Sequence, residues 1–179
     1  LGTSWSVYPL YKSEDKPQTP IVAAQAHIEM PDGKVLRLIT DETWKTRPSP
    51  NAMLGTWMFT NFGGEYYDAA KEMPSWCSAD LDETNWKPAT VYQPSLILSA
   101  EMVEPNRRVK KIEPVAVEAI EGQGYRVDMG VNFAGFVELD VKGKPGDIVE
   151  LQFSEDEKKM ITHKLRSAYR IGPGGQGTF

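Results

Sequence analysis

The chain has very little cysteine and histidine. Its 179 residues include one cysteine, Cys77, and two histidines, His27 and His163. A single thiol excludes an intrachain disulfide framework and a cysteine-rich zinc site. Nucleophilic catalysis by serine would need one of the two imidazoles as its base. We interpret His27 as a surface residue of a strand and His163 as a solvated loop residue, so no catalytic serine site is expected.

Long apolar runs and concentrated basic charge are also missing. No stretch of roughly 18 consecutive apolar residues occurs, so no membrane-spanning helix is predicted, and the first residues lack the layout of a signal peptide. Lys and Arg total 20 against 25 Asp and Glu, which gives a net charge of −5. The largest basic cluster is Arg107-Arg108 with Lys110-Lys111. Because a nucleic-acid backbone requires a concentrated basic face, nucleic acid is not an expected partner.

The overall composition is that of an ordinary globular protein, with 40% hydrophobic and 25% charged residues. A chain of this length can form one large or two small domains. It opens on Leu1-Gly2 and closes on Thr178-Phe179, which begins an alternating strand directly after a glycine-rich turn. We therefore expect the chain to be a fragment of a longer protein, with any signal sequence lying upstream.

Alternation of apolar and polar residues predicts two hairpins. The first joins residues 21–30, as a half-buried strand, to residues 35–39 through Pro31-Asp32-Gly33, a sequence whose residues favour a tight turn. The second joins residues 136–141 to residues 148–153 through a Pro-Gly-Asp turn. Both hairpins indicate antiparallel sheets.

The remaining pattern predicts an all-β protein. Only a short turn of helix is expected, around Ala79–Thr84. A charged segment near Pro105 separates two differently patterned halves, so we predict two antiparallel β-sandwich (jelly-roll-like) domains in series, residues 1–105 and residues 106–179, the second truncated. Further strands are predicted at residues 112–120, 125–128 and 165–171.

Residues 60–86 are aromatic, acidic and rich in turn-forming residues, which predicts a loop region. Aromatic rings can lie on the apolar faces of sugars while carboxylates accept hydrogen bonds from hydroxyl groups, so this composition fits a sugar-facing surface. It also fits a loop whose aromatic side chains plug the end of a sandwich, because aromatic side chains are mostly buried. The second interpretation is preferred, and both stay open.

The acidic turn around Asp80, Asp82 and Asn85 offers carboxylates and carbonyls of the kind that bind calcium. A solvated acidic turn is the preferred interpretation, and too few histidines are present for a histidine-rich metal site. We therefore expect no metal and no cofactor, with calcium as the alternative.

Three motifs, in order, resemble segments of bacterial α-L-rhamnosidases of glycoside hydrolase family 78. Residues 64–69, Gly-Glu-Tyr-Tyr-Asp-Ala, resemble the Gly-Glu-x-Tyr-Asp-Ala-Arg signature of the N-terminal β-sandwich domain. Residues 80–89 resemble the Asp-Asp-Ser-x-Trp-x-x-Ala run, and residues 128–136 are similar to the Asp-x-Gly-Gln-Asn-x-x-Gly-x segment of the next domain. The chain departs from these patterns at Ala70, where the family has arginine, and at Val131, where it has glutamine.

The resemblance implies a non-catalytic accessory fragment. In this family the parent enzyme hydrolyses terminal α-L-rhamnose from glycans with inversion, and its catalytic acid and base lie on a later (α/α)-barrel domain. The first domain is then galactose-binding-like or carbohydrate-binding-like, and the second is concanavalin-like and incomplete at its C-terminus. The chain alone is expected to be inactive. Its expected partners are the catalytic and other domains of the parent, in the periplasm or outside the cell.

The resemblance also suggests where a rhamnose-containing glycan would bind. Sugar binding would require at least one exposed ring beside a carboxylate, among Trp57, Tyr66, Trp76 and Trp86. The preferred alternative is that this surface packs against the catalytic barrel. The candidate carbohydrate-binding residues are Glu65, Tyr66, Tyr67, Asp68, Trp76 and Trp86. The motif positions expected to shape the backbone are Gly64, Asp128, Asn132 and Gly135.

A second class of function stays open from the sequence. A stand-alone carbohydrate- or protein-binding β-sandwich without a hydrolase partner fits the all-β pattern equally well. Continuation of the reading frame into helical repeats would favour the accessory fragment.

Overall fold

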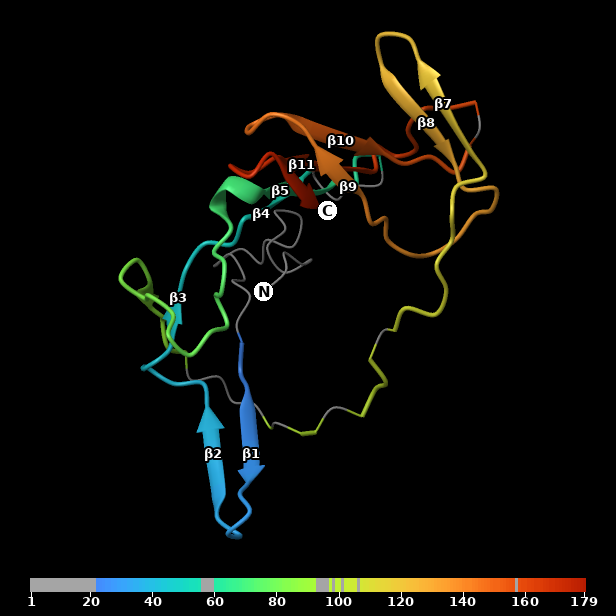
Figure 1. Cartoon of the computed structure of the whole chain (residues 1–179). Coiled ribbons are helices and arrows are strands. Elements are labelled where there is room, and N and C mark those ends of the chain that lie inside the picture. Colours follow the sequence, from blue (N-terminus) through green and yellow to red (C-terminus); the bar gives the residue numbers. More distant parts are fainter. Residues whose placement is uncertain are drawn as a thin grey trace, which may run out of the picture. The chain divides into compact units, whose positions relative to one another are not determined.

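A computed structural model describes residues 22–55, 60–92, 97, 99–100, 102–105, 107–156 and 158–179. Every regular element in these residues is a β-strand, apart from one short 3-10 helix (Figure 1). The prediction of an all-β protein is therefore confirmed. Strands pair in antiparallel fashion except for β5 (Gly64–Asp68) and β11 (Arg166–Arg170), which are parallel.

The chain divides into two compact units, and each is described by itself. The first unit comprises Leu1–Leu96 and Glu138–Phe179, and the second comprises Ile97–Val137. The assignment of residues 1–105 and 106–179 to separate sandwiches stays a prediction. In this structure one sheet draws strands from both ranges, because β5 precedes Pro105 and its partner β11 follows it.

The main sheet of the first unit has the strand order β10-β11-β5-β4 (Figure 1). β10 (Ile148–Gln152) and β4 (Asn51–Leu54) are its outer strands. β5 lies inside this sheet, so the loop predicted over residues 60–86 was wrong for Gly64–Asp68. After η3 the residues of that range form turns and no strand, as predicted. Glycine allows the close pairing: a Cβ on Gly64 would lie 2.0 Å from the carbonyl oxygen of Arg166.

A second layer, formed by β9 (Asp140–Lys142) and β12 (Gln176–Thr178), packs against this sheet. The two layers come close at Gly177, where a Cβ would lie 2.0 Å from the hydroxyl oxygen of Tyr169. Side chains from both layers form one small core. Its buried members are Ala69, Val141, Tyr169 and Ile171, and Tyr67, Leu139, Val149 and Phe179 pack against them half-buried.

The predicted hairpin of residues 136–141 and 148–153 does not form. Its turn exists, because the Asp147 N–H donates to the Lys144 carbonyl at 3.0 Å. The Ile171 N–H, however, donates to the Asp147 carbonyl at 2.8 Å and brings the C-terminal segment between the two strands. β9 consequently pairs with β12 and β10 with β11, so the chain crosses from one layer to the other at this turn.

The hairpin predicted at residues 21–39 forms, and a further hairpin joins strands that were predicted at residues 112–120 and 125–128 without a stated pairing. β1 (Gln25–Glu29) pairs with β2 (Val35–Ile39) in the first unit, and β7 (Ala116–Ile120) pairs with β8 (Gly124–Asp128) in the second. In β1 and β2 the apolar pairs Ala26–Leu38 and Ile28–Leu36 share one face. Every residue of these two strands is exposed, so the half-buried face that the sequence predicted is open in the described part of the chain.

The segment between β5 and β6 (Lys87–Pro88) contains turns rather than the helical turn predicted around Ala79–Thr84. One reason is Asp82, whose carboxylate accepts the Thr84 N–H at 2.9 Å, a local bond that competes with helix formation. The 3-10 helix η3 (Ala69–Lys71) lies earlier, directly after β5. β6 pairs with β3 (Lys45–Thr46), which anchors the far end of this segment.

Candidate functional site

Asp68, the last residue of β5, is enclosed by its partners. It is 2% exposed, the only buried charged residue in the described part of the chain. One carboxylate oxygen accepts from the Arg170 Nη1 at 3.3 Å and from the Lys71 Nζ at 3.2 Å. The other accepts from the Ala70 N–H at 3.2 Å and thereby caps η3.

These partners determine the charge state of Asp68. Burial alone would raise the pKa of its carboxyl group, since desolvation disfavours the charged form. The hydrogen bonds from Lys71 and the Ala70 N–H, with the charge of Arg170, outweigh that effect and hold the pKa below its ordinary value. Asp68 is therefore an ionised structural group that links β5, η3 and β11.

Tyr67 points into the core. Its ring stacks on Tyr169 with 5.7 Å between centroids and 4° between planes, and it also meets Phe179 at 6.5 Å. Burial raises the pKa of Tyr67 to about 12, with further contributions from its hydrogen bond to Glu72 and from the charge of Glu72. The ring face that a sugar would need is therefore covered by another ring.

The other candidate residues of this strand face different surroundings. Glu65 is exposed, whereas Tyr66 is half-buried and lies opposite Ala52 of β4 and Ala168 of β11. Alternation along the strand separates Glu65 and Tyr67 from Tyr66 and Asp68. These four side chains therefore do not converge on one surface.

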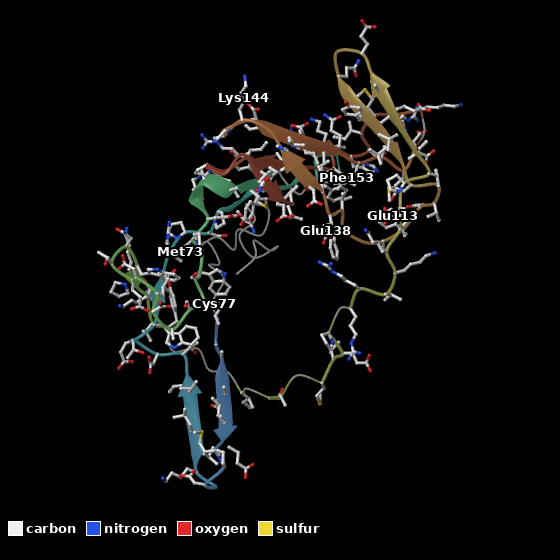
Figure 2. All side chains as sticks on the ribbon, in the orientation of Figure 1. Met73, Cys77, Glu113, Glu138, Lys144 and Phe153 are labelled. Atoms are coloured by element: carbon white, nitrogen blue, oxygen red, sulfur yellow. The ribbon has the colours of Figure 1, made fainter. Side chains whose placement is uncertain are left out.

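The two tryptophans lie on the segment between β5 and β6, along which Figure 2 labels Met73 and Cys77. Trp76 is 65% exposed, and Trp86 is half-buried with its Nε1 enclosed and without a partner in the described residues. Within the described ranges, no hydrogen bond or ring contact joins either side chain to residues 64–68. Among the candidate rings Tyr66, Trp76 and Trp86, only that of Trp76 belongs to an exposed residue; Trp57 lies outside the described residues.

The third motif forms a turn in the second unit. The Asp128 carboxylate accepts the Gly130 N–H at 2.7 Å, and Gly130 has a φ of +68°. Asn132 and Gly135 are exposed, and a Cβ on Gly135 would lie 3.0 Å from the Phe133 ring. This geometry supports a role for the motif in shaping the backbone.

The carboxylates of the acidic turn accept hydrogen bonds from residues of the same turn. Asp80 accepts from the Ser78 hydroxyl, and Asp82 accepts from the Thr84 hydroxyl and N–H. These hydrogen bonds lower the pKa of both carboxyl groups. Among the residues that the structure describes, no group of three His, Cys, Asp or Glu could hold a metal ion. Calcium binding at this turn stays a prediction.

Arg170 and Lys71 were missed by the sequence interpretation. Both bind Asp68, and Arg170 does so across 102 positions of the chain. The ion pair between Lys71 and Asp68 could have been predicted from the sequence, because residues three positions apart are neighbours in a helical turn. The pairing of Arg170 with Asp68 could not be predicted, because alternation predicts a strand but does not identify the strand that pairs with it.

The sequence and the fold of this chain are both similar to those of known proteins. The sequence model of the family described as "Alpha-L-rhamnosidase N-terminal domain" matches residues 7–110. This chain therefore belongs to the family of α-L-rhamnosidase N-terminal domains. An α-L-rhamnosidase of Formosa agariphila is 30% identical over 138 residues, covering 76% of this chain and 14% of that protein. One from Streptomyces avermitilis is 29% identical over 173 residues, covering 90% of this chain and 16% of that protein.

Solved structures show the same fold. The α-L-rhamnosidase of Dictyoglumus thermophilum matches with a TM-score of 0.73 at 23% identity, over 88% of this chain and 18% of that one. The enzyme of Aspergillus terreus matches with a TM-score of 0.67 at 19% identity, again over 88% and 18%. The chain thus spans less than a fifth of each of these proteins. No helix in its described residues is long and apolar enough to cross a membrane.

Proposed function

We propose that this chain is a non-catalytic accessory domain of an α-L-rhamnosidase that releases terminal α-L-rhamnose from glycans with inversion. Its partners are the catalytic and other domains of that enzyme, which acts in the periplasm or outside the cell. The signature segment at residues 64–69 braces the fold and does not hold the sugar.

The family match over residues 7–110 and the small share of each relative that the chain spans support an accessory domain. The observation that carries the bracing role is the burial of Asp68. A carboxylate that recognises a glycan must offer free oxygen atoms to hydroxyl groups. Asp68 is 2% exposed and already accepts from Arg170, Lys71 and the Ala70 N–H. The neighbouring Tyr67 is likewise engaged by Tyr169. Removing a brace of this kind lowers stability, whereas removing a sugar ligand lowers affinity.

A second candidate function rests on Trp76. This residue is 65% exposed on a segment that also carries acidic residues, and an exposed indole can stack on a sugar ring. In that case the chain binds carbohydrate at the segment between β5 and β6, either within the enzyme or as a stand-alone module. This site does not need Asp68.

Calorimetric titration with L-rhamnose and a rhamnose-containing oligosaccharide, with and without calcium, distinguishes the two. We expect no saturable heat, no release of rhamnose by the chain alone, and a lower melting temperature in Asp68→Ala. Saturable heat that disappears in Trp76→Ala would establish the carbohydrate site instead. Heat that disappears in a folded Asp68→Ala variant would contradict the bracing role.

A further inference from the structure

Four of the five residues from Arg107 to Lys111 are basic, and they lie in an exposed stretch without regular structure. The described residues between β6 and β7 form no strand or helix. Residues 107–111 are all exposed, and Val109, in their centre, is 94% exposed. Exposed segments of this kind are the preferred sites of proteolytic cleavage.

Two side chains of this segment, Arg107 and Lys110, are loosely held. Arg107 and Lys110 make no hydrogen bond or ion pair with any described residue. Lys111 pairs with the exposed Glu113 at 2.9 Å, and the Arg108 guanidinium lies 5.3 Å from the centroid of the Phe136 ring. A surface contact of either type is worth about 1 kcal/mol or less. The absence of such contacts with described residues at Arg107 and Lys110 makes these two positions the ones most open to a protease.

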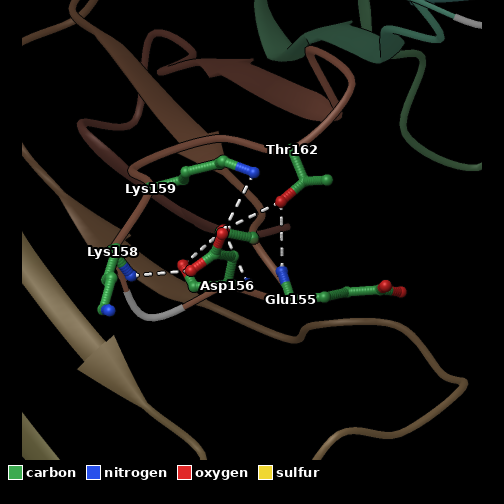
Figure 3. A network of polar contacts seen from close by, with 6 residues as sticks. Glu155, Asp156, Lys158, Lys159 and Thr162 are labelled. Atoms are coloured by element: carbon green, nitrogen blue, oxygen red, sulfur yellow. Dashed lines mark hydrogen bonds and ion pairs between the residues drawn. The ribbon is translucent and has the colours of Figure 1, made fainter.

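A second basic pair, Lys158-Lys159, provides a contrast within the same chain (Figure 3). Asp156 accepts the Lys158 N–H at 2.9 Å and pairs with the Lys159 ammonium at 3.0 Å. The hydroxyls of Ser154 and Thr162 meet at 2.9 Å and close the loop across its base. A protease would have to break this network before the backbone could extend through its active site.

We propose that residues 107–111 are a cleavage site for a trypsin-like serine protease and that the two products stay together as one particle. The protease hydrolyses the peptide bond after Arg107 or Lys110. The C–N bond breaks, the oxygen of a water molecule enters the new carboxylate, and the following residue becomes a new amino terminus. This inference does not depend on the proposed function.

The products stay together because the main sheet is shared between them. Cleavage leaves β4 and β5 on the first product and β10 and β11 on the second. Backbone hydrogen bonds of 3.2 Å join Gly63 N–H to the Lys164 carbonyl and Arg166 N–H to the Gly63 carbonyl. The stacked rings of Tyr67 and Tyr169 add apolar contact across the same boundary.

Limited digestion of the whole chain with trypsin tests the site. Among the basic residues that the structure describes, we expect the first cuts within residues 107–111, read by mass spectrometry. Glutamine at all four basic positions of this segment should slow the loss of intact chain about tenfold or more, whereas Lys158→Gln with Lys159→Gln should not change it. A first cut at Lys158 or Lys159, or unchanged digestion of the quadruple variant, would refute the proposed site.

Size-exclusion chromatography of the digest tests the association. The two products should elute together at the volume of the intact chain and separate in denaturant. Arg170→Gln removes one contact across the boundary and should lower the urea concentration at which they separate, while Gly174→Ala, which adds a methyl group in open space, should not. If the two products elute separately in native buffer, the proposal that they stay associated is contradicted.

Discussion

The main sheet and the β1–β2 hairpin are both built from short strands, yet only the sheet contains buried residues. In β11, Ala168 is 5% and Tyr169 2% exposed, whereas every residue of β1 and β2 is exposed. The hairpin pairs residues close in sequence, and the sheet pairs β5 with β11 about a hundred residues later. A local pattern is therefore enough to pair two strands, and burial requires distant partners.

This difference indicates which part of the described structure contributes most to the free energy of unfolding. Apolar burial contributes about 25 cal/mol per Å² removed from water, and in these residues it is concentrated where the two layers of the first unit meet. An isolated two-stranded hairpin is marginally stable at best. Substitutions in the sheet should therefore destabilise the protein far more than matched substitutions in the hairpin.

The largest effect is expected for Gly64→Val. Its Cβ would lie 2.0 Å from the Arg166 carbonyl oxygen, so β5 and β11 would be forced apart. We expect urea denaturation to show a loss of about 3 kcal/mol or more. Gly33→Ala in the hairpin turn meets no atom within 4 Å but retains an unfavourable φ of +80°, and should cost about 1 kcal/mol. Equal losses in the two variants would remove the distinction between the regions.

A smaller difference is expected between two isoleucines. Ile171 is 2% exposed and Ile28 is 41% exposed. Ile171→Ala should cost about 2–4 kcal/mol, because it removes buried methylene groups and leaves a cavity. Ile28→Ala should cost well under half as much, because much of its side chain already contacts water. Thermal and urea unfolding of both variants would check this, and a larger loss for Ile28→Ala would show that the hairpin face is covered.

The pH dependence should also differ between the regions. The folded-state pKa of Asp68 is lowered, so its charged form stabilises the fold above the ordinary value and this contribution is lost as the pH falls from about 4 through the lowered pKa. The stability difference between the natural chain and Asp68→Asn should therefore shrink on acidification. Asp32 in the hairpin turn also has a lowered pKa, through its exposed partner Lys34, and Asp32→Asn should show the same trend more weakly. A difference for Asp68→Asn that is independent of pH would contradict the assigned charge state.

Much of the strand pattern could be predicted from the sequence. Alternation located β1, β2, β8, β10 and β11, and Pro31-Asp32-Gly33 identified the first turn, because the side-chain period and turn chemistry are local properties. The motifs at residues 64–69, 80–89 and 128–136 pointed to the family that the comparisons show.

The partners of the strands could not be predicted in the same way. The Pro-Gly-Asp turn before β10 predicted a hairpin, and only the hydrogen bonds of Ile171 reveal that the chain crosses between layers there. Residues 64–68 were included in a predicted loop because the stretch around them, residues 60–86, is rich in aromatic and turn-forming residues. Its place inside the sheet depends on β11, which brings Arg170 to Asp68.

The central claim is that the signature carboxylate of Asp68 braces β5 against β11 through Arg170. A double-mutant cycle of Asp68→Asn, Arg170→Gln and the double variant, measured by urea unfolding at neutral pH, tests it most directly. We predict that each single variant is less stable than the natural chain and that the double variant loses clearly less than the sum of the two. Additive losses, or no loss in Asp68→Asn, would contradict the brace and leave Asp68 free for another role.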